Sequence, residues 1–409
     1  MSNGTAVGDT LELTIGEVAA GGWCVARLDG TSESALVVFV RHALPGERVL
    51  AVITQLTAKF ARADAIEIRD PAPTRVSPPC PYARPGGCGG CDWQHASLPA
   101  QRQFKALVIR QQLQRIAGLD ADVTVEPVSP DSAGLGWRSR VRFAVGQDGQ
   151  AGLYQHRSHE IVPVRDCLIA HPLVTQAEVT RQSWSGATSV DVAAAPGSGE
   201  RAVMVHGRLR KPGQRDRHAP HFLTQRAANR DWRVTASGFW QVHPGAADLL
   251  AIAVLAGLEP MPGETALDLF CGAGLFAGVL ADAVGPDGTV IAVEQDKAAV
   301  KDARHNLRGT PWARVHLGDA AEVISRTGTA GASIAVLDPP RTGADRRLIE
   351  VLAVARQLRR IAYVSCDPAT LARDLKVFGE HGWQLGALRA FDAFPMTHHV
   401  EALAVLRPG

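Results

Sequence analysis

The 409-residue chain has few cysteines, no long apolar run and a net charge of only +2. Its longest apolar stretches, such as ALVVFV, are far shorter than the ~18 residues that a membrane-spanning helix needs, so we predict no contact with a membrane. The N-terminus, MSNGTAVGDT, lacks a basic region followed by an apolar core, and we therefore expect no signal peptide and a cytoplasmic location. The hydrophobic fraction of 46% indicates a globular protein, and the length predicts two or three domains.

Only seven cysteines occur, and four of them follow an unusual pattern. Cys80, Cys88 and Cys91 lie in a segment rich in Pro and Gly that has no helical or strand period, and Cys167 follows about 75 residues later. Thiolates with this spacing, in a compartment where thiols stay reduced, indicate a metal or an iron–sulfur cluster. A tetrahedral zinc site is the alternative that these residues leave open.

The small net charge hides an uneven distribution. Residues 76–240 carry a net charge of +7, whereas the segments before and after them carry −2 and −3. Most of the excess is Arg, with the alternating Arg138, Arg140 and Arg142 predicted to share one face of a strand and a second basic run at 208–221. Guanidinium groups suit phosphate oxygens, so the pattern predicts a nucleic-acid-binding face, with an ordinary solvated basic surface as the alternative.

Turn residues and hydrophobic periods divide the chain into three parts. Residues 1–72 read as short strands separated by Gly-containing turns, which predicts a small β-barrel related to the OB-fold, a common RNA-binding module. Residues 73–235 predict a central β-rich domain that contains the cysteine loop and a helix at about 93–118, which we expect to pack on the catalytic domain. Residues 236–409 alternate helix and buried strand, which predicts an α/β doubly wound sheet.

A glycine turn opens this last domain. In TALDLFCGAGLFAG a strand runs into Gly272 and Gly274 and then into an apolar helix, so the backbone can approach a ligand closely at the end of the first strand. The three-glycine fingerprint of a dinucleotide-binding dehydrogenase is absent. Acidic residues also lie in or after four of the predicted strands: Asp268, Glu294, Asp319 and Asp338. This order resembles a Rossmann-type methyltransferase that uses S-adenosylmethionine (SAM), with Glu294 about twenty positions on to accept hydrogen bonds from ribose hydroxyls.

Two residues near the end of the chain are candidates for the chemistry. Cys366, in YVSCDPATLARDL, directly follows a buried strand on the side where a cofactor would lie. Glu401, in FPMTHHVE, is preceded by His398 and His399 and enters the last strand. A thiolate and a carboxylate together predict a nucleophile and a general base, whereas a core cysteine and a surface carboxylate are the structural alternatives.

The four-cysteine set and the motifs GFWQVHPGAA, DLFCGAG, LDPPRTG, SCDPATLARD and FPMTHHVE resemble the bacterial 5-methyluridine RNA methyltransferases. These proteins combine a TRAM domain, an iron–sulfur cluster and a Rossmann methyltransferase domain, and the resemblance covers essentially the whole chain. It implies a 4Fe-4S cluster rather than zinc on Cys80, Cys88, Cys91 and Cys167, with Cys366 as nucleophile and Glu401 as base. The implied cofactor pocket comprises Gln241, Phe270, Gly272, Gly274, Leu275, Glu294, Asp319 and Asp338.

Three positions depart from the family pattern. Leu275 and His243 stand where an Asn is frequent, and Asp367 replaces the usual Asn after the nucleophile. The catalytic pair Cys366 and Glu401 is nevertheless present, which argues against a non-catalytic RNA-binding or folding factor. A cytosine-5 methyltransferase is disfavoured as well, because its Pro-Cys motif is replaced here by Asp-Pro-Pro-Arg.

The resemblance also implies a partner. We expect the substrate to be RNA, with 23S ribosomal RNA favoured because a TRAM module is predicted and tRNA-specific bacterial relatives often lack one. A tRNA is the alternative substrate. We expect the protein to act as a monomer.

Overall fold

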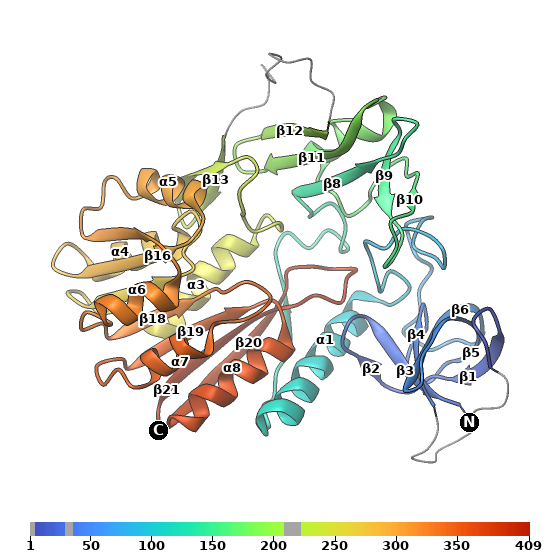
Figure 1. Ribbon diagram of the computed structural model, residues 1–409, viewed down its shortest axis with the longest axis horizontal. Coiled ribbons are helices and arrows are strands. Elements are labelled where there is room, and N and C mark those ends of the chain that lie inside the picture. Colours follow the sequence, from blue (N-terminus) through green and yellow to red (C-terminus); the bar gives the residue numbers. More distant parts are fainter. Residues whose placement is uncertain (1–4, 29–35, 208–221) are drawn as a thin grey trace.

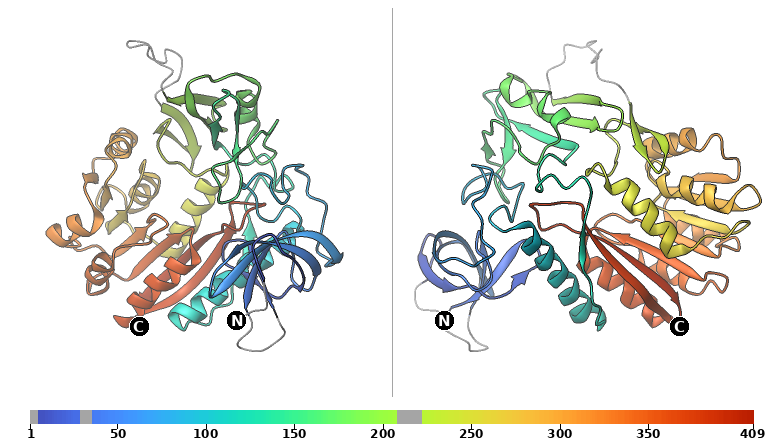
Figure 2. Two further views of the ribbon diagram at one scale, coloured as in Figure 1. Left: turned by 45° about the vertical axis from the view of Figure 1, so that its right-hand side comes forward. Right: turned by 180° about the vertical axis from the view of Figure 1, so that it is seen from behind.

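The computed structural model describes residues 5–28, 36–207 and 222–409, which form three parts around a central helix (Figure 1). The N-terminal barrel and the catalytic α/β domain lie on opposite sides of helix α1 (Leu98–Gln112), and the central β-rich part lies beyond them both, as the rotated views of Figure 2 also show. None of the described helices is long and apolar enough to cross a membrane.

The first part is a barrel of short strands, as predicted. Its sheet has the order β1–β5–β6–β4–β3–β2, and residues 16–17 close it by exchanging backbone hydrogen bonds with Val25 of β3. Side chains alternate between the inside and the outside, so that Val49, Ala51 and Ile53 of β5 are all buried. The strands are β1 (Thr10–Thr14), β2 (Val18–Ala19), β3 (Trp23–Arg27), β4 (Val37–Arg41), β5 (Arg48–Leu56) and β6 (Phe60–Asp70).

The central part is built on a five-stranded antiparallel sheet in the order β10–β9–β8–β11–β12. A separate hairpin, β13–β14, leaves this sheet and packs on the catalytic domain through the fully buried Trp232. The elements are β8 (Arg140–Val145), β9 (Ala151–Tyr154), β10 (Ile161–Val162), α2 (Pro172–Thr175), a 3-10 turn (Val179–Arg181), β11 (Ala187–Ala195), β12 (Glu200–Gly207), β13 (Phe222–Ala227) and β14 (Arg230–Thr235).

The catalytic domain is a doubly wound α/β sheet, which confirms the predicted fold class. Its eight strands have the order β17–β16–β15–β18–β19–β21–β20–β7, and β15 to β19 are parallel whereas β21 is antiparallel to its neighbours. The strands are β7 (Val125–Pro127), β15 (Thr265–Leu269), β16 (Thr289–Glu294), β17 (Ala313–Leu317), β18 (Ile334–Leu337), β19 (Arg360–Ser365), β20 (Trp383–Asp392) and β21 (Glu401–Pro408).

Helices cover both faces of this sheet. Ala266 of β15 faces the core formed with α3, α4 and α5, whereas the next residue, Leu267, faces the core formed with α6, α7 and α8. This alternation explains why the strands are apolar throughout, since both faces are buried. The helices are α3 (Ala246–Leu258), α4 (Leu275–Val284), α5 (Lys297–Asn306), α6 (Ala320–Thr327), α7 (Arg346–Ala353) and α8 (Pro368–Glu380).

Helix α1 joins the barrel to the catalytic domain. Its Ile109 belongs to the core beneath the large sheet, as the sequence predicted, but Val108 packs in the core of the barrel. The fully buried Lys105 forms an ion pair of 2.5 Å with Asp392 at the end of β20 and donates to the backbone oxygen of Phe394 at 3.0 Å. The helix therefore holds the end of β20 as well as two hydrophobic cores.

The structure differs from the sequence-based expectation at both ends of this helix segment. The helix begins at Leu98 rather than near 93, because Trp93 is buried in the barrel core and Pro99 fits the first turn of a helix. After α1 the chain forms one π-helical turn, Leu113–Ala117, and then contributes β7 to the edge of the catalytic sheet. A strand of only three residues has no period that could have placed it there.

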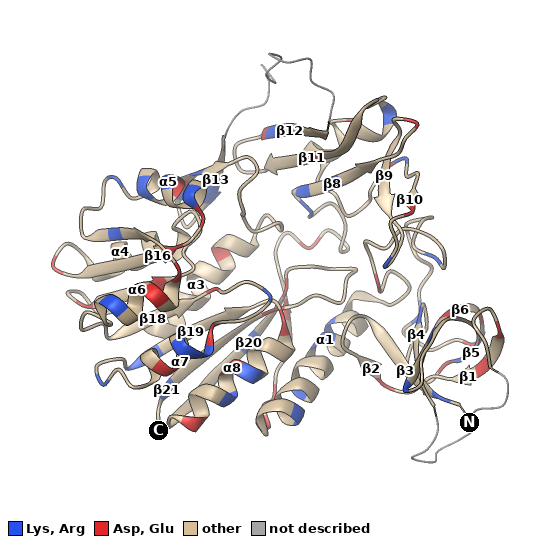
Figure 3. Ribbon diagram, in the orientation of Figure 1, with Lys and Arg blue, Asp and Glu red and all other residues tan. Residues whose placement is uncertain are grey.

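The predicted phosphate-binding face of the central part is wrong for two of its three arginines. Arg140 is buried and donates to the backbone oxygen of Ala236 at 2.8 Å, and burial lowers its pKa to about 10. Arg142 is held at 2.7 Å by both carboxylate oxygens of Asp191. Basic and acidic residues are interspersed over all three parts in Figure 3. The second basic run, 208–221, lies outside the described residues.

Candidate active site and cysteine cavity

The predicted site residues lie at the carboxyl ends of neighbouring parallel strands. In the order of the sheet, Asp319 follows β17, Glu294 ends β16, the glycine turn follows β15, Asp338 follows β18 and Cys366 follows β19. The strand order reverses between β15 and β18, which is where open α/β sheets bind their ligands. The sequence-predicted cofactor residues and the predicted nucleophile therefore share one edge of the sheet.

The turn after β15 has the backbone of a ligand-binding loop. Phe270 has a φ of 71°, which is strained for a bulky residue, and Gly274 has a φ of 93° where the helix α4 begins. The N–H of Gly272 donates to Oε2 of Glu294 at 2.9 Å, and the other carboxylate oxygen accepts from the N–H of Asp296 at 2.8 Å. These bonds orient Glu294 at the turn, as its predicted role requires.

Asp268 is a buried carboxylate without a counterion. Its Oδ2 accepts from the N–H of Ala277 at 2.6 Å, but the buried Oδ1 has no hydrogen-bond partner among the described residues. Burial raises the pKa of Asp268 to about 8, and the charges of Asp338 and Glu294 raise it further, against the hydrogen bond from Ala277. A ligand with a positive charge would compensate this site, and the sulfonium and ammonium groups of SAM are such charges.

Cys366 and Glu401 face each other across two strands. Ser365 of β19 pairs with Ala402 of β21, and because these strands are antiparallel, the next residue of β19 lies opposite Glu401. Glu401 is only 4% exposed, so it is not the surface residue that its place at a strand end would favour. The sheet register thus brings together the two residues that the sequence assigned to catalysis.

The charge state of this pair depends on its surroundings. Burial, the charge of Glu401 and that of Asp338 raise the pKa of Cys366 to about 11, whereas Arg341 lowers it by its charge and a hydrogen bond. Burial and the charge of Asp338 raise the pKa of Glu401 well above its usual value, and burial raises the pKa of Asp338 to about 7. Without a ligand, these groups therefore hold protons at neutral pH.

Arg341 is a site residue that the sequence reasoning did not assign. It lies in the LDPPRTG motif, three positions after Asp338, and its charge opposes the raised pKa values of both Cys366 and Glu401. Its Nη2 also donates to Nε2 of His399 at 3.3 Å. The available signal was a basic residue directly after an acidic strand end, in a site that must stabilise a thiolate.

Other predicted positions have simpler surroundings. Asp319 caps helix α6 by accepting from the N–H of Glu322 at 3.1 Å, and Leu275 is buried in the first turn of α4. Gln241 is buried, but no hydrogen bond joins its side chain to the carboxylates in the described part of the chain. Trp240 packs against Trp232 in the core.

The departures from the family pattern have local structural roles. Asp367 caps α8 by accepting from the N–H groups of Ala369 and Thr370 at 3.0 and 2.9 Å, so its charge is directed to the helix N-terminus. His243 is buried, stacks on Trp137 at 6.1 Å and accepts from the N–H of Gly245 at 3.2 Å.

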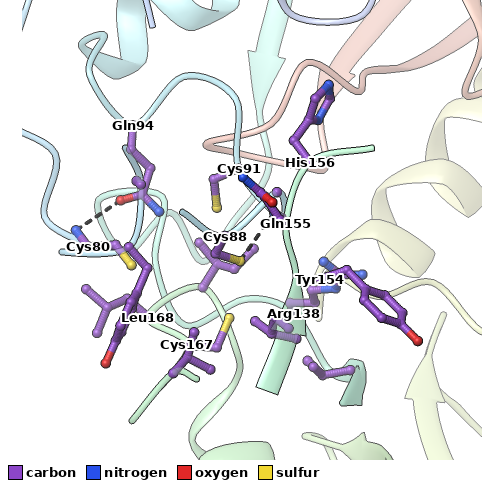
Figure 4. Close-up of a pocket in the computed structure, with 18 of the residues that line it drawn as sticks. Cys80, Cys88, Cys91, Gln94, Arg138, Tyr154, Gln155, His156, Cys167 and Leu168 are labelled. Atoms are coloured by element: carbon purple, nitrogen blue, oxygen red, sulfur yellow. Dashed lines mark hydrogen bonds between the residues drawn. The ribbon is translucent and has the colours of Figure 1, made fainter. Parts of the chain in front are cut away.

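The four cysteines of the predicted cluster line one cavity of about 260 Å³ (Figure 4). Three come from the loop before α1, and Cys167 comes from the segment after β10. None of the seven cysteines forms a disulfide. Within the described ranges, no three His, Cys, Asp or Glu side chains are grouped to hold a single metal ion.

The cavity provides donors for sulfur ligands of a larger group. Burial raises the pKa values of Cys88, Cys91 and Cys167, and the neighbouring thiols raise them further, so these thiols are neutral without a cation. The N–H of Gly90 donates to Sγ of Cys88 at 3.4 Å, and the charge of Arg138 and nearby N–H groups oppose the rise at Cys167. Thiols that become thiolates only with a cation, and that already receive hydrogen bonds, fit an iron–sulfur cluster.

The strand order, the glycine turn and the carboxylates define the class of the catalytic domain as a Rossmann-like SAM-dependent methyltransferase. Comparison with known families agrees: residues 4–66 match the TRAM domain, 261–328 a methyltransferase domain and 328–408 the tRNA (Uracil-5-)-methyltransferase family.

Full-length relatives give the particular family. An uncharacterised RNA methyltransferase of Streptomyces avermitilis is 49% identical over 98% of this chain and 99% of its own length, and one of Bifidobacterium longum is 32% identical over 96% of both. The chain therefore belongs to this family of RNA methyltransferases with a TRAM domain. The crystal structure of Pyrococcus abyssi tRNA (uracil-54, C5)-methyltransferase with S-adenosyl-L-homocysteine has the same fold, with a TM-score of 0.70, 22% identity and coverage of 97% of this chain and 100% of that one.

The unpaired Asp268 carboxylate predicts a gain of stability when its charge is removed. Because the pKa of Asp268 is raised from 3.8 to about 8, the folded protein loses stability as the pH rises from about 4 to about 8, and Asp268→Asn escapes this loss. We expect the variant to melt at least about 2 °C above the wild type at pH 9 without cofactor, with a smaller difference at pH 5. It should also bind SAM more weakly.

Thermal scans at both pH values, with and without SAM, check this. Asp287→Asn, at an exposed turn, is the control and should change neither quantity. A variant that melts below the wild type at pH 9 would contradict the assignment.

Proposed function

We propose that this protein methylates carbon 5 of a specific uridine in RNA through a covalent adduct with Cys366. The observation that carries the proposal is the position of Cys366 opposite Glu401, next to a cofactor edge that bears three buried or oriented carboxylates. A non-catalytic RNA-binding protein would have no need for these buried charges, which cost stability.

Each residue has a step that its surroundings support. When bound, SAM supplies a methyl group that its sulfonium charge activates. Cys366, as a thiolate that Arg341 stabilises, adds to carbon 6 of uracil and makes carbon 5 nucleophilic. Glu401 then accepts the proton from carbon 5, a role to which its raised pKa is suited, and elimination of Cys366 restores the ring.

The uridine must leave its stack to reach this edge of the sheet. Phe239 is 68% exposed on the segment that leads to Gln241, and we propose that it stacks on an RNA base. Its neighbour Trp240 is a core residue and takes no part in this contact.

We favour a uridine of 23S ribosomal RNA as the target, because the barrel adds an RNA-binding module that tRNA-specific bacterial relatives often lack. A tRNA is the second candidate. It is favoured by the likeness to the Pyrococcus abyssi protein, whose title names a tRNA uridine and which matches this chain over nearly its whole length.

For the cysteine cavity we propose a 4Fe-4S cluster on Cys80, Cys88, Cys91 and Cys167. The cluster has a structural role in this proposal, because its ligands come from two distant segments and would join the loop before α1 to the central sheet. Zinc is the alternative for a set of four thiolates.

The two catalytic groups should fail differently when they are replaced. Cys366→Ala removes the nucleophile, so methylation should fall to background and no adduct should form. Glu401→Gln leaves Cys366 able to add and the methyl group able to transfer, but carbon 5 keeps its proton and elimination stalls. The Glu401→Gln protein should therefore remain covalently bound to methylated RNA in denaturing electrophoresis.

The Cys366→Ala variant is the matched control, since it should give no such band. Slow turnover in Glu401→Gln is compatible with the mechanism, because His398 or His399 can accept the proton. Methylation by Cys366→Ala at a rate near that of the wild type would show that the mechanism is wrong.

Protein purified without oxygen should be brown, with broad absorption near ~400 nm. Cys88→Ala should lose this absorption and the iron, whereas Cys24→Ala, in the barrel core, should keep both because Cys24 lies outside the cavity. Elemental analysis of the anaerobic protein decides between the metals, and stoichiometric zinc without iron would exclude the cluster.

Mass-spectrometric mapping of 5-methyluridine in RNA from a deletion strain tests the target. We expect one or more methylated positions of 23S rRNA to be lost and to return when the wild-type gene is restored. A loss confined to tRNA would replace the rRNA target by the second candidate and leave the chemistry unchanged.

A further inference from the structure

The loop between β20 and β21, residues 393–400, is held by segments that lie far from it in the sequence. The backbone N–H groups of Asp92 and Trp93 both donate to the backbone oxygen of Met396, at 3.0 and 3.1 Å. On the other side of the loop, the N–H of Met396 donates to Oε1 of Gln101 at 2.8 Å. This loop ends at Glu401, so the cysteine loop and α1 together determine where the proposed base begins.

Asp92 makes the most specific of these contacts. It directly follows Cys91 and is 7% exposed, and its Oδ2 accepts from the backbone N–H of His398 at 3.1 Å and from Nδ1 of the same histidine at 2.6 Å. The other oxygen lies 3.6 Å from the guanidinium of Arg41. Gly22 of the barrel leaves room for it, since a Cβ there would lie 2.8 Å from Cβ of Asp92.

The contacts continue from His398 to the nucleophile. The rings of His398 and His399 have centroids 4.0 Å apart, and Nε2 of His399 accepts from Nη2 of Arg341 at 3.3 Å. Arg341 is the group that stabilises the thiolate of Cys366 in the proposed mechanism. An unbroken series of contacts therefore runs from the wall of the cysteine cavity to the reacting sulfur.

We propose that Asp92 is a positioning residue, which sets the place of Arg341 beside Cys366 through His398 and His399. It touches neither substrate nor cofactor and acts only through these side chains. The inference rests on the proposed function, because the role of Arg341 is defined by the Cys366 adduct. The mechanism itself does not require Asp92, so the two can fail separately.

A double-mutant cycle tests the inference in the full-length protein. Asp92→Ala and His398→Ala should each slow single-turnover adduct formation on substrate RNA by about 10- to 100-fold, as is usual for residues that orient reacting groups. The double variant should be no slower than the slower single variant, because both changes break the same series of contacts. The dissociation constants of RNA and SAM should stay within about 3-fold of the wild type.

Hydrogen exchange gives a readout that does not depend on activity. The amide of His398 donates to Asp92, so Asp92→Ala should accelerate its exchange at least about 10-fold while the amides of β21 keep their protection. The matched control is Glu126→Gln, which breaks the ion pair of 2.8 Å with Arg389 at the edge of the same sheet. It should change neither the exchange of His398 nor the adduct rate.

Adduct rates in Asp92→Ala within 3-fold of the wild type, or single effects that multiply in the double variant, would overturn the inference. Should Asp92→Ala fail to fold, His398→Ala still decides, because that half-exposed side chain is not a core residue and an unchanged rate would exclude the series of contacts. If the wild type binds SAM but forms no adduct with any RNA, the proposed function fails. The exchange of His398 in Asp92→Ala then still accepts or rejects its dependence on Asp92.

Discussion

The burial of several carboxyl groups at one edge of a parallel sheet is the constraint on which the catalytic domain depends. Asp268, Asp338 and Glu401 all have raised pKa values because of burial, and within the described residues Arg341 is the one cation whose charge opposes this at Glu401 and Cys366. An edge of this kind is unfavourable when empty and favourable for a cationic ligand. The same charges that make the free protein less stable thus define what the site binds.

The strand order makes this edge possible. Parallel strands all end on the same side, so five strands bring their last residues together without long connections, while the antiparallel β21 brings Glu401 to the same side by its first residue. The reversal of strand order between β15 and β18 separates the glycine turn and Glu294 from Cys366 and Glu401. Cofactor and base therefore have adjacent places, which lowers the entropic cost of bringing them together.

The sequence predicted the elements of this arrangement better than their contacts. The barrel strands, the doubly wound domain and the strand ends at Glu294, Asp338 and Cys366 follow from periodicity and turn residues, which are local properties. The β7 strand, the start of α1 and the burial of Arg140 did not follow from them, because each depends on a partner far away in the chain. The contact between Asp92 and His398 spans 306 positions and has no sequence signal at all.

By itself, the sequence determined the class of the catalytic domain and the residue types of both sites, because a glycine turn, acidic strand ends and spaced thiols are chemical requirements that are written in consecutive residues. Only the tertiary structure decided which residues act together. The register of β19 and β21 places Glu401 opposite Cys366, and the packing of the cysteine loop against residues 393–400 connects two sites that the sequence kept apart. Side-chain contacts of this kind arise from the packing of distant segments in a dense interior, which no local pattern encodes.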